Sequence, residues 1–181
     1  MFSMNLFTGR SFNHPNLLPL QGMKFEKHND YEFCYLLFPY LSKSLRDDIS
    51  SRHILTTTVE ESIKCKPYKD LELLELFSGV VDGVLAFHEK NLAHRDVKVE
   101  NVMLHPLTRA PILIDYGSVG PLELKVHTRN DILNISDSSA MNSTISYRAP
   151  ELFDGGTPHG KDEVSLIHKM YCVTQHLSAC H

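Results

Sequence analysis

The octapeptide HRDVKVEN at residues 94–101 is the stretch of sequence that decides the fold. It supplies a carboxylate at Asp96, a cation at Lys98 and an amide at Asn101, and a second carboxylate, Asp115, follows a short apolar run. Phosphoryl transfer from MgATP requires a carboxylate beside the attacking hydroxyl, a cation that offsets the charge on the moving group, and oxygen ligands for the metal. These residue types therefore predict Asp96, Lys98 and Asn101 as catalytic residues, and Asn101 and Asp115 as Mg²⁺ ligands.

The two predicted metal ligands flank a predicted hairpin. Its strands are the apolar runs 102–104 and 111–114, and the turn-rich HPLTRA lies between them. The hairpin is expected to hold the two ligands at its opposite ends, where side chains are placed more accurately than in free loops.

Two further motifs lie downstream of the octapeptide, DYG at 115–117 and APE at 149–151. Together the three motifs resemble those of the eukaryotic protein kinases. Two positions resemble the serine/threonine class of these kinases and not the tyrosine class. They are Lys98, two residues after Asp96, and Thr144, which lies ahead of Tyr147. The run IDYGS, a long segment and then TISYRAPELF resemble the Numb-associated kinases, in particular the branch related to the myristoylated and palmitoylated serine/threonine kinase.

The resemblance covers roughly residues 13–153 and implies a function. It implies a Ser/Thr protein kinase that uses ATP and Mg²⁺ and transfers the γ-phosphoryl group to hydroxyls of a protein substrate. It also implies that Arg95 pairs with a phosphate on the long segment after residue 117, with Ser136, Ser138, Ser139 and Ser143 as candidate phosphorylation sites.

The resemblance also assigns an adenine site. Phe38 is implied to be the gatekeeper, the backbone of Pro39 and Leu41 to accept from and donate to adenine, and Met103 to pack under the ring. A proline is compatible with this role because only its carbonyl is used. Tyr116 stands where the family has Phe and adds only a hydroxyl.

Each assigned residue also has an ordinary structural explanation. Asp96, Asn101 and Asp115 could be capping or turn residues, and Lys98 could be a surface lysine. The hinge run 33–41 could be an ordinary buried strand. The order and spacing of the three motifs favour the functional interpretation.

The sequence also departs from the family pattern. No G-x-G-x-x-G precedes residue 13, no lysine occurs in a V-A-I-K context, and nothing after Phe153 resembles D-x-W-S-x-G. The expected fold is therefore α+β, a partial kinase-like fold of hinge strands plus the N-terminal half of the large helical lobe. Residues 1–153 are expected to form the partial domain and 154–181 a divergent tail.

These departures predict that the chain as written binds ATP weakly and has no appreciable kinase activity. The alternative function is a catalytically inactive fragment that acts as a binding or competing module. Its exposed apolar surface would require a chaperone or protein partner.

The hydrophobic pattern predicts the main elements. A hairpin is expected around residues 28–30, with a buried second strand at 33–38. Ser44 is expected to cap a short helix at 45–49, and Asp70 a long one at 70–91 whose Val80, Val84 and Phe87 face is partly bare. Residues 115–149 show little periodicity and are expected to form a long loop, in which the segment 117–143 is expected to be mobile.

Composition sets the remaining expectations. The chain has 181 residues, 42% of them hydrophobic, and a net charge of −4, which favours a globular protein and argues against nucleic-acid binding. The apolar run 33–41 is too short to span a bilayer, so no transmembrane segment is expected. Four cysteines without a C-x-x-C pair, and no secretory signal, indicate a cytoplasmic location. The family resemblance adds peripheral association with endomembranes.

Overall fold

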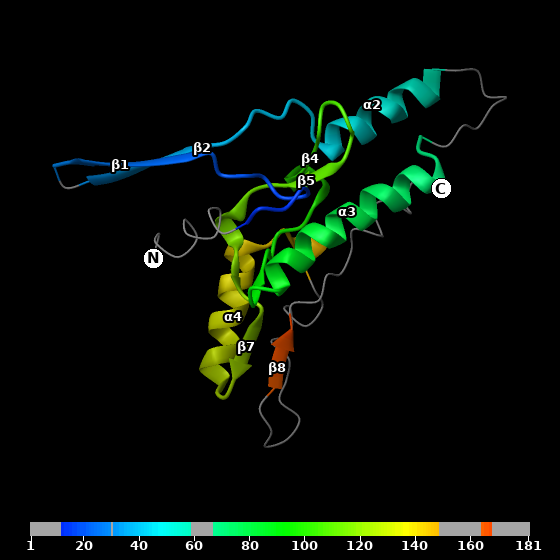
Figure 1. Ribbon diagram of the computed structural model, residues 1–181. Coiled ribbons are helices and arrows are strands. Elements are labelled where there is room, and N and C mark those ends of the chain that lie inside the picture. The colour runs from blue at the N-terminus through cyan, green and yellow to red at the C-terminus, as the bar shows by residue number, and fades with distance from the viewer. Residues whose placement is uncertain (1–11, 30, 59–66, 149–163, 168–181) are drawn as a thin grey trace.

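The computed structural model describes residues 12–29, 31–58, 67–148 and 164–167. The elements form an α+β fold (Figure 1), which confirms the expected fold class. In chain order they are β1 (Gly22–His28), β2 (Tyr31–Leu37), α2 (Leu45–Thr58), α3 (Asp70–His88), β3 (Leu92–Ala93), the 3₁₀ turn η1 (Val99–Asn101), β4 (Val102–Leu104), β5 (Pro111–Leu113), η2 (Tyr116–Ser118), β6 (Gly120–Pro121), β7 (Glu123–Val126), α4 (Arg129–Asn142), η3 (Ile145–Tyr147) and β8 (Val164–Ile167).

Helix α3 supplies the central face of the apolar core. The predicted helical period is confirmed, because Val80, Val84 and Phe87 are all buried on this face. The expectation that the face is partly bare is wrong. The Phe12 ring packs against Phe87 in a tilted arrangement with 4.4 Å between ring centroids, and Leu17 joins the same core cluster. The segment before β1 therefore covers the helix.

Two glycines allow this close packing. A Cβ at Gly79 would lie 2.6 Å from Cγ of Pro111 and 2.8 Å from Nδ2 of Asn16, and one at Gly83 would lie 3.0 Å from the Asn16 carbonyl oxygen. Strand β5 and the segment around Asn16 therefore approach the helix more closely than any other residue type would permit.

Strands β4 and β5 form the predicted small hairpin, with Val102 opposite Leu113. Leu17 forms a parallel bridge to Leu113, and Ser44 forms an antiparallel bridge to Met103. The hairpin is thus flanked on both sides by chain segments from the N-terminal half, and these contacts fix it to the core.

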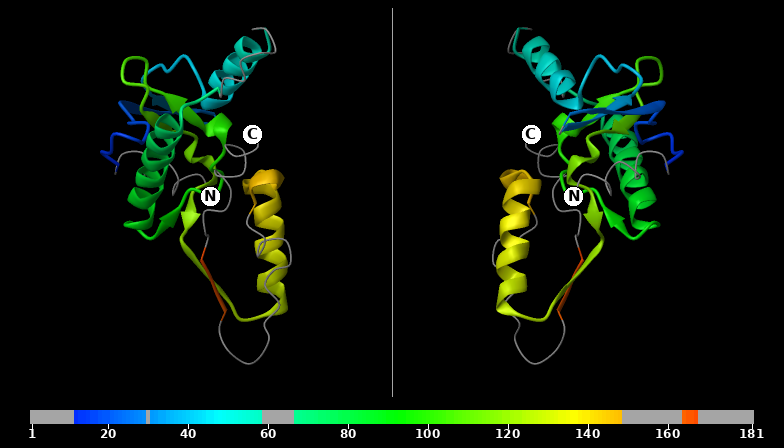
Figure 2. Two further views of the ribbon diagram at one scale, coloured as in Figure 1. Left: turned by 90° about the vertical axis from the view of Figure 1, so that its right-hand side faces the viewer. Right: turned by 90° about the vertical axis from the view of Figure 1, so that its left-hand side faces the viewer.

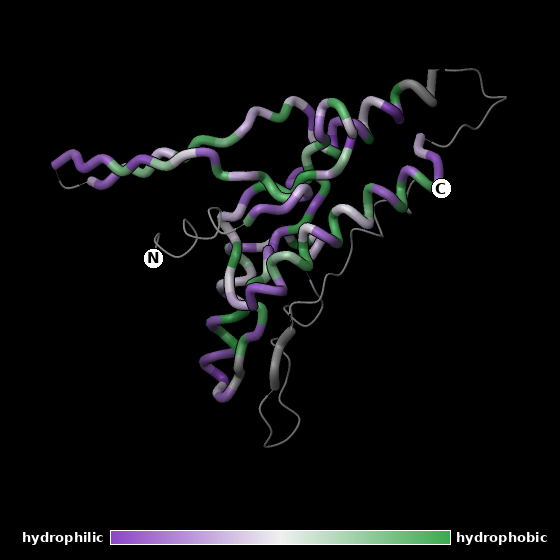
Figure 3. Tube along the Cα trace, in the orientation of Figure 1, coloured by the Kyte–Doolittle hydropathy of each residue, from purple (hydrophilic) through white to green (hydrophobic). Residues whose placement is uncertain are grey.

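Strands β1 and β2 form the other predicted hairpin, with Phe25 opposite Cys34. The expectation of a buried second strand is wrong, since every residue of β2 is exposed. Figure 1 shows the hairpin projecting from the body, and Figure 3 shows hydrophobic residues along it with hydrophilic ones at its tip. Both of its faces carry apolar side chains, including Phe25 and Leu36 on one and Phe33 and Leu37 on the other.

The helix ends differ partly from expectation. Ser44 precedes α2, and its hydroxyl accepts from the Asp47 backbone N–H at 3.1 Å, as a capping residue does. However, α2 continues to Thr58 and not only to residue 49. Helix α3 has Lys69 at its N-cap position without a side-chain cap, and Asp70 is its first residue. Among the described residues, no helix is long and apolar enough to cross a bilayer.

The segment after Asp115 is not a loop throughout. It contains helix α4, which begins with a capping box in which Thr128 and Asp131 exchange side-chain and backbone hydrogen bonds. Figure 2 shows α4 alongside the ribbon of β7 and β8, and α4 contacts β7. Strand β8 lies within residues 154–181 and pairs antiparallel with β7.

Candidate active site

The carboxylate of Asp96 is held by hydrogen bonds at both oxygens. Oδ2 accepts from Lys98 Nζ at 2.6 Å and from Asn101 Nδ2 at 3.0 Å. Oδ1 accepts from the hydroxyl and the backbone N–H of Thr144 at 2.7 and 3.0 Å. The structure therefore brings together the three predicted catalytic residues, and adds a threonine 48 positions away.

Thr144 was assigned no bonding role from sequence alone. Its hydroxyl also accepts from Lys98 Nζ at 2.9 Å, so Lys98 lies between Thr144 and Asp96. Its place three residues ahead of Tyr147 in the TISYRAPE run was the available signal. The APE motif itself and Phe153 lie outside the described residues.

The charge environment keeps Asp96 ionised. Burial alone would raise the pKa of this carboxyl, but the hydrogen bonds from Lys98 and Thr144, together with the charge of Lys98, lower it below its ordinary value. Asp96 is only 9% exposed, so these fixed donors replace most of the solvent around it. The result is an ionised acceptor of fixed orientation.

His94 connects this loop to strand β5. The imidazole is 2% exposed, and burial lowers its pKa. Nδ1 accepts from the backbone N–H of Asp96 at 3.4 Å, and Nε2 lies 3.0 Å from the Ile114 carbonyl oxygen. A neutral ring with its proton on Nε2 satisfies both contacts. His94 thus fixes the segment that carries Asp96 beside the residue that precedes Asp115.

Asn101 and Asp115 lie at the same end of the β4–β5 hairpin and not at opposite ends. The backbone N–H of Ile114 donates to the Asn101 carbonyl at 2.9 Å, because an antiparallel hairpin brings its two outer ends together. The amide nitrogen of Asn101 is engaged by Asp96, which leaves its amide oxygen as the possible metal ligand. Amide and carboxylate oxygens suit Mg²⁺, so this donor pair fits a magnesium ion carried with a nucleotide.

The backbone at Asp115 is in a left-handed conformation with φ of 64°. Its carboxylate accepts from the Gly117 N–H at 3.2 Å, while the residue itself is exposed. The next residue is anchored, since the Tyr116 hydroxyl donates to the Leu18 carbonyl at 2.9 Å. The Tyr116 ring also packs edge-on against Phe87. The hydroxyl by which Tyr116 differs from the family's Phe therefore forms a hydrogen bond with the N-terminal segment.

The predicted adenine residues lie on two segments that meet. Phe38, Pro39 and Leu41 are half-buried on the connection from β2 to α2, and Met103 is half-buried on β4. The bridge from Ser44 to Met103 joins the end of this connection to β4.

Within the part of the chain that the structure describes, Arg95 forms no hydrogen bond with the four candidate phosphorylation serines. Its guanidinium lies against Gly120, where an added Cβ would be 0.9 Å from Nη2. Ser143 instead accepts from Arg148 Nε at 2.9 Å, and Ser139 is buried in α4.

The site thus combines an ionised carboxylate, a neighbouring cation, and an amide and a second carboxylate at one end of a hairpin. The protein kinase domain model matches residues 6–166, and the chain belongs to this family.

Similar proteins carry consistent names. Serine/threonine-protein kinase 16 of Mus musculus and that of Homo sapiens are each 31% identical over 165 residues, covering 91% of this chain and 51% of the relative. A probable serine/threonine-protein kinase of Dictyostelium discoideum is 34% identical over 146 residues, covering 78% of this chain and 17% of that protein. The chain thus spans about half the length of the first two relatives.

Proposed function

We propose that this chain carries the catalytic loop and metal ligands of a Ser/Thr protein kinase, which transfers the γ-phosphoryl group of ATP to a hydroxyl of a protein substrate. The observation that carries the proposal is the set of bonds that joins Asp96, Lys98, Asn101 and Thr144. The names of the similar proteins support the same reaction.

The residues divide the work of this reaction. MgATP, when bound, supplies the phosphoryl group and a metal that neutralises its charge. Asp96 accepts a hydrogen bond from the attacking hydroxyl and orients it, since its own pKa is too low for complete proton removal in advance. Lys98 offers a cation beside that hydroxyl, and Asn101 and Asp115 would supply oxygen ligands to the metal.

We also propose the finer placement that the resemblance implies. Membership of the Numb-associated kinases, in the branch of the myristoylated and palmitoylated kinase, is supported by the similarity to serine/threonine-protein kinase 16. A cytoplasmic location is supported by the cysteine pattern, and its peripheral association with endomembranes rests on the resemblance alone. A chaperone or protein partner is supported by the exposed apolar residues of the β1–β2 hairpin.

The test measures MgATP binding and phosphoryl transfer in two proteins. The first is the chain itself, which we expect to bind MgATP weakly and to transfer no appreciable phosphate. The second is a chimera that supplies a protein-kinase glycine loop, strand lysine and C-terminal helices. In the chimera, Asp96→Asn and Asp115→Ala should each lower transfer by more than ~10²-fold.

The matched control is Asp70→Asn, which removes an exposed carboxylate at the start of α3. It should leave transfer by the chimera unchanged. Two outcomes would contradict the proposed function. One is transfer by the Asp115→Ala chimera at the rate of the unsubstituted chimera, and the other is an unsubstituted chimera that transfers no phosphate.

A further inference from the structure

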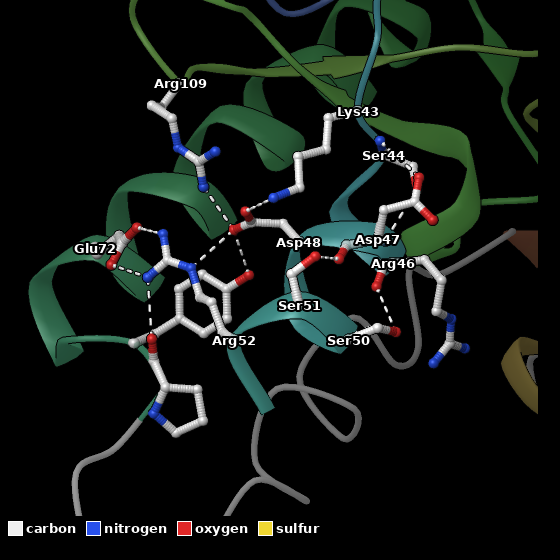
Figure 4. Close-up of polar contacts among 12 residues, drawn as sticks. Lys43, Ser44, Arg46, Asp47, Asp48, Ser50, Ser51, Arg52, Glu72 and Arg109 are labelled. Atoms are coloured by element: carbon white, nitrogen blue, oxygen red, sulfur yellow. Dashed lines mark hydrogen bonds and ion pairs between the residues drawn. The ribbon is translucent and has the colours of Figure 1, made fainter. Parts of the chain in front are cut away.

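The carboxylate of Asp48 binds four side chains from separate parts of the chain (Figure 4). Oδ2 accepts from the Tyr68 hydroxyl at 2.8 Å, from Arg52 Nε at 2.9 Å and from the Arg109 guanidinium, while Oδ1 pairs with Lys43 Nζ at 2.9 Å. Asp48 is only 2% exposed. A buried carboxylate requires such partners, but the proposed reaction uses none of them directly.

Lys43 connects this carboxylate to the predicted adenine site. Its backbone carbonyl accepts from the Leu104 N–H of β4 at 3.0 Å, and the following residue, Ser44, forms the bridge to Met103. The side chain of Lys43 is partly exposed and reaches back to Asp48. The ion pair between Lys43 and Asp48 therefore helps to hold the end of segment 38–44 against β4, the strand that carries Met103.

Arg109 connects the same carboxylate to the turn of the β4–β5 hairpin. Its backbone has φ of 64°, a left-handed conformation that non-glycine residues rarely adopt. Its N–H donates to the His105 carbonyl at 2.9 Å, and its guanidinium reaches Asp48. Asp48 thus bonds to the segment that docks on β4 and to the turn that joins β4 to β5.

Arg52 anchors the cluster to the helical body. It binds both carboxylate oxygens of Glu72 on α3, at 3.0 and 2.6 Å, and donates to the Pro67 carbonyl at 3.0 Å. Its guanidinium also stacks over the Tyr68 ring, 4.0 Å from the centroid. In Figure 4, Arg52 lies between Asp48 and Glu72, whereas Lys43 approaches Asp48 from the other side. On one side of Asp48, Arg52 connects the cluster to α3. On the other side, Lys43 connects it to segment 38–44.

We propose that Asp48 is a positioning residue of the nucleotide site, which acts through Lys43 by holding segment 38–44 on β4. The proposal rests on the proposed function, since it gives Pro39, Leu41 and Met103 their purpose. Helix α2, which carries Asp48, would then help to set the distance between the backbone of Pro39 and Leu41 and the side chain of Met103.

The test compares Lys43→Met with Glu72→Gln in the full chain. Lys43→Met leaves Asp48 bonded to Arg52, Tyr68 and Arg109, so the fold is retained. Glu72→Gln weakens the α3 side of the same network without contacting Lys43. Amide hydrogen exchange of Leu104, whose N–H reports the docking of segment 38–44, is measured without nucleotide, and Ile114 is the reference amide.

In Lys43→Met we expect exchange at Leu104 to be about tenfold faster, exchange at Ile114 to be unchanged, and the Kd for MgATP by calorimetry to rise about tenfold. Glu72→Gln should lower the melting temperature and change neither quantity. Unchanged Leu104 exchange in Lys43→Met, or an equal change in Glu72→Gln, overturns the inference. Faster exchange with an unchanged Kd overturns its nucleotide part. An inactive chimera overturns the proposed function, while Leu104 exchange in the chain still decides whether Lys43 holds the segment.

Discussion

The Tyr116 hydroxyl joins two segments that are 98 positions apart through its bond to the Leu18 carbonyl. We expect Tyr116→Phe to keep the ring packing and to lower the free energy of unfolding by about 0.5–1.5 kcal/mol. Urea unfolding measures this loss. Tyr35→Phe, which removes an exposed hydroxyl on β2, is the control and should change little. An equal effect of the two substitutions would contradict the assigned bond.

The bonds of Asp48 predict that the free energy of unfolding depends on pH. Burial alone would raise the pKa of this carboxyl, but hydrogen bonds from Arg109, Lys43 and Tyr68, with Arg52 also in contact, lower it far below its ordinary value. Its contribution to stability is therefore complete above the unfolded-state pKa of about 3.9 and is lost as the pH falls below that value.

We expect the free energy of unfolding of the wild type to decrease between pH 5 and about pH 3, and that of Asp48→Asn to decrease less steeply. Urea titrations at several pH values give both slopes. Asp82→Asn, at an exposed position of α3, should retain the wild-type slope. Parallel curves for the wild type and Asp48→Asn would show that Asp48 titrates alike in the folded and unfolded chain.

At the residue scale, sequence could predict what depends on local spacing. Asp96, Lys98 and Asn101 lie within six positions, so their proximity follows from the octapeptide. Thr144, and Tyr68 and Arg109 among the partners of Asp48, could not be predicted in this way. They come from segments up to 61 positions away, and no local pattern records such a contact.

At the scale of elements, Gly79 shows how α3 meets β5. Alanine normally stabilises a helix relative to glycine by about 1 kcal/mol. Here the added Cβ would lie 2.6 Å from the rigid Pro111 ring, so we expect Gly79→Ala to destabilise the protein by about 1–3 kcal/mol. The exposed neighbour Ser78→Ala, measured in the same urea experiment, should be neutral or stabilising. A more stable Gly79→Ala protein would show that the strand can move away.

The predicted elements also show the limits of hydrophobic patterns. The period of α3 was sufficient because one face of the helix is apolar along most of its length. Helix α4 was missed because it is rich in Ser and Asn and has a weak apolar face, although Thr128 and Asp131 have the spacing of a capping box. The exposure of β2 could not be predicted, since an apolar run does not show what packs against it.

At the scale of the whole molecule, the β1–β2 hairpin is the most conspicuous projection (Figure 1). Exposed strands with unpaired edges and apolar side chains promote association between chains. We expect the double variant Phe33→Lys and Tyr35→Glu to associate less than the wild type in sedimentation velocity at high protein concentration. Leu107→Lys, which replaces an exposed apolar residue in the β4–β5 turn, should not have this effect. Equal association of all three proteins would place the adhesive surface elsewhere.

The bonds that join residues 16–18 to residues 111–116 also affect the order of events during biosynthesis. The Asn16 amide reaches the Pro111 carbonyl across 95 positions, and Tyr116 reaches Leu18 across 98. A ribosome adds about 5–20 residues per second, so about 5–20 s pass between synthesis of Leu18 and of its partner. For the last part of this interval, about 1–5 s, α3 is complete but β5 has not yet been made. The nascent chain therefore presents α3 without β5 for seconds, and translation speed sets the time available for a co-translational chaperone to bind the apolar surface that β5 later covers.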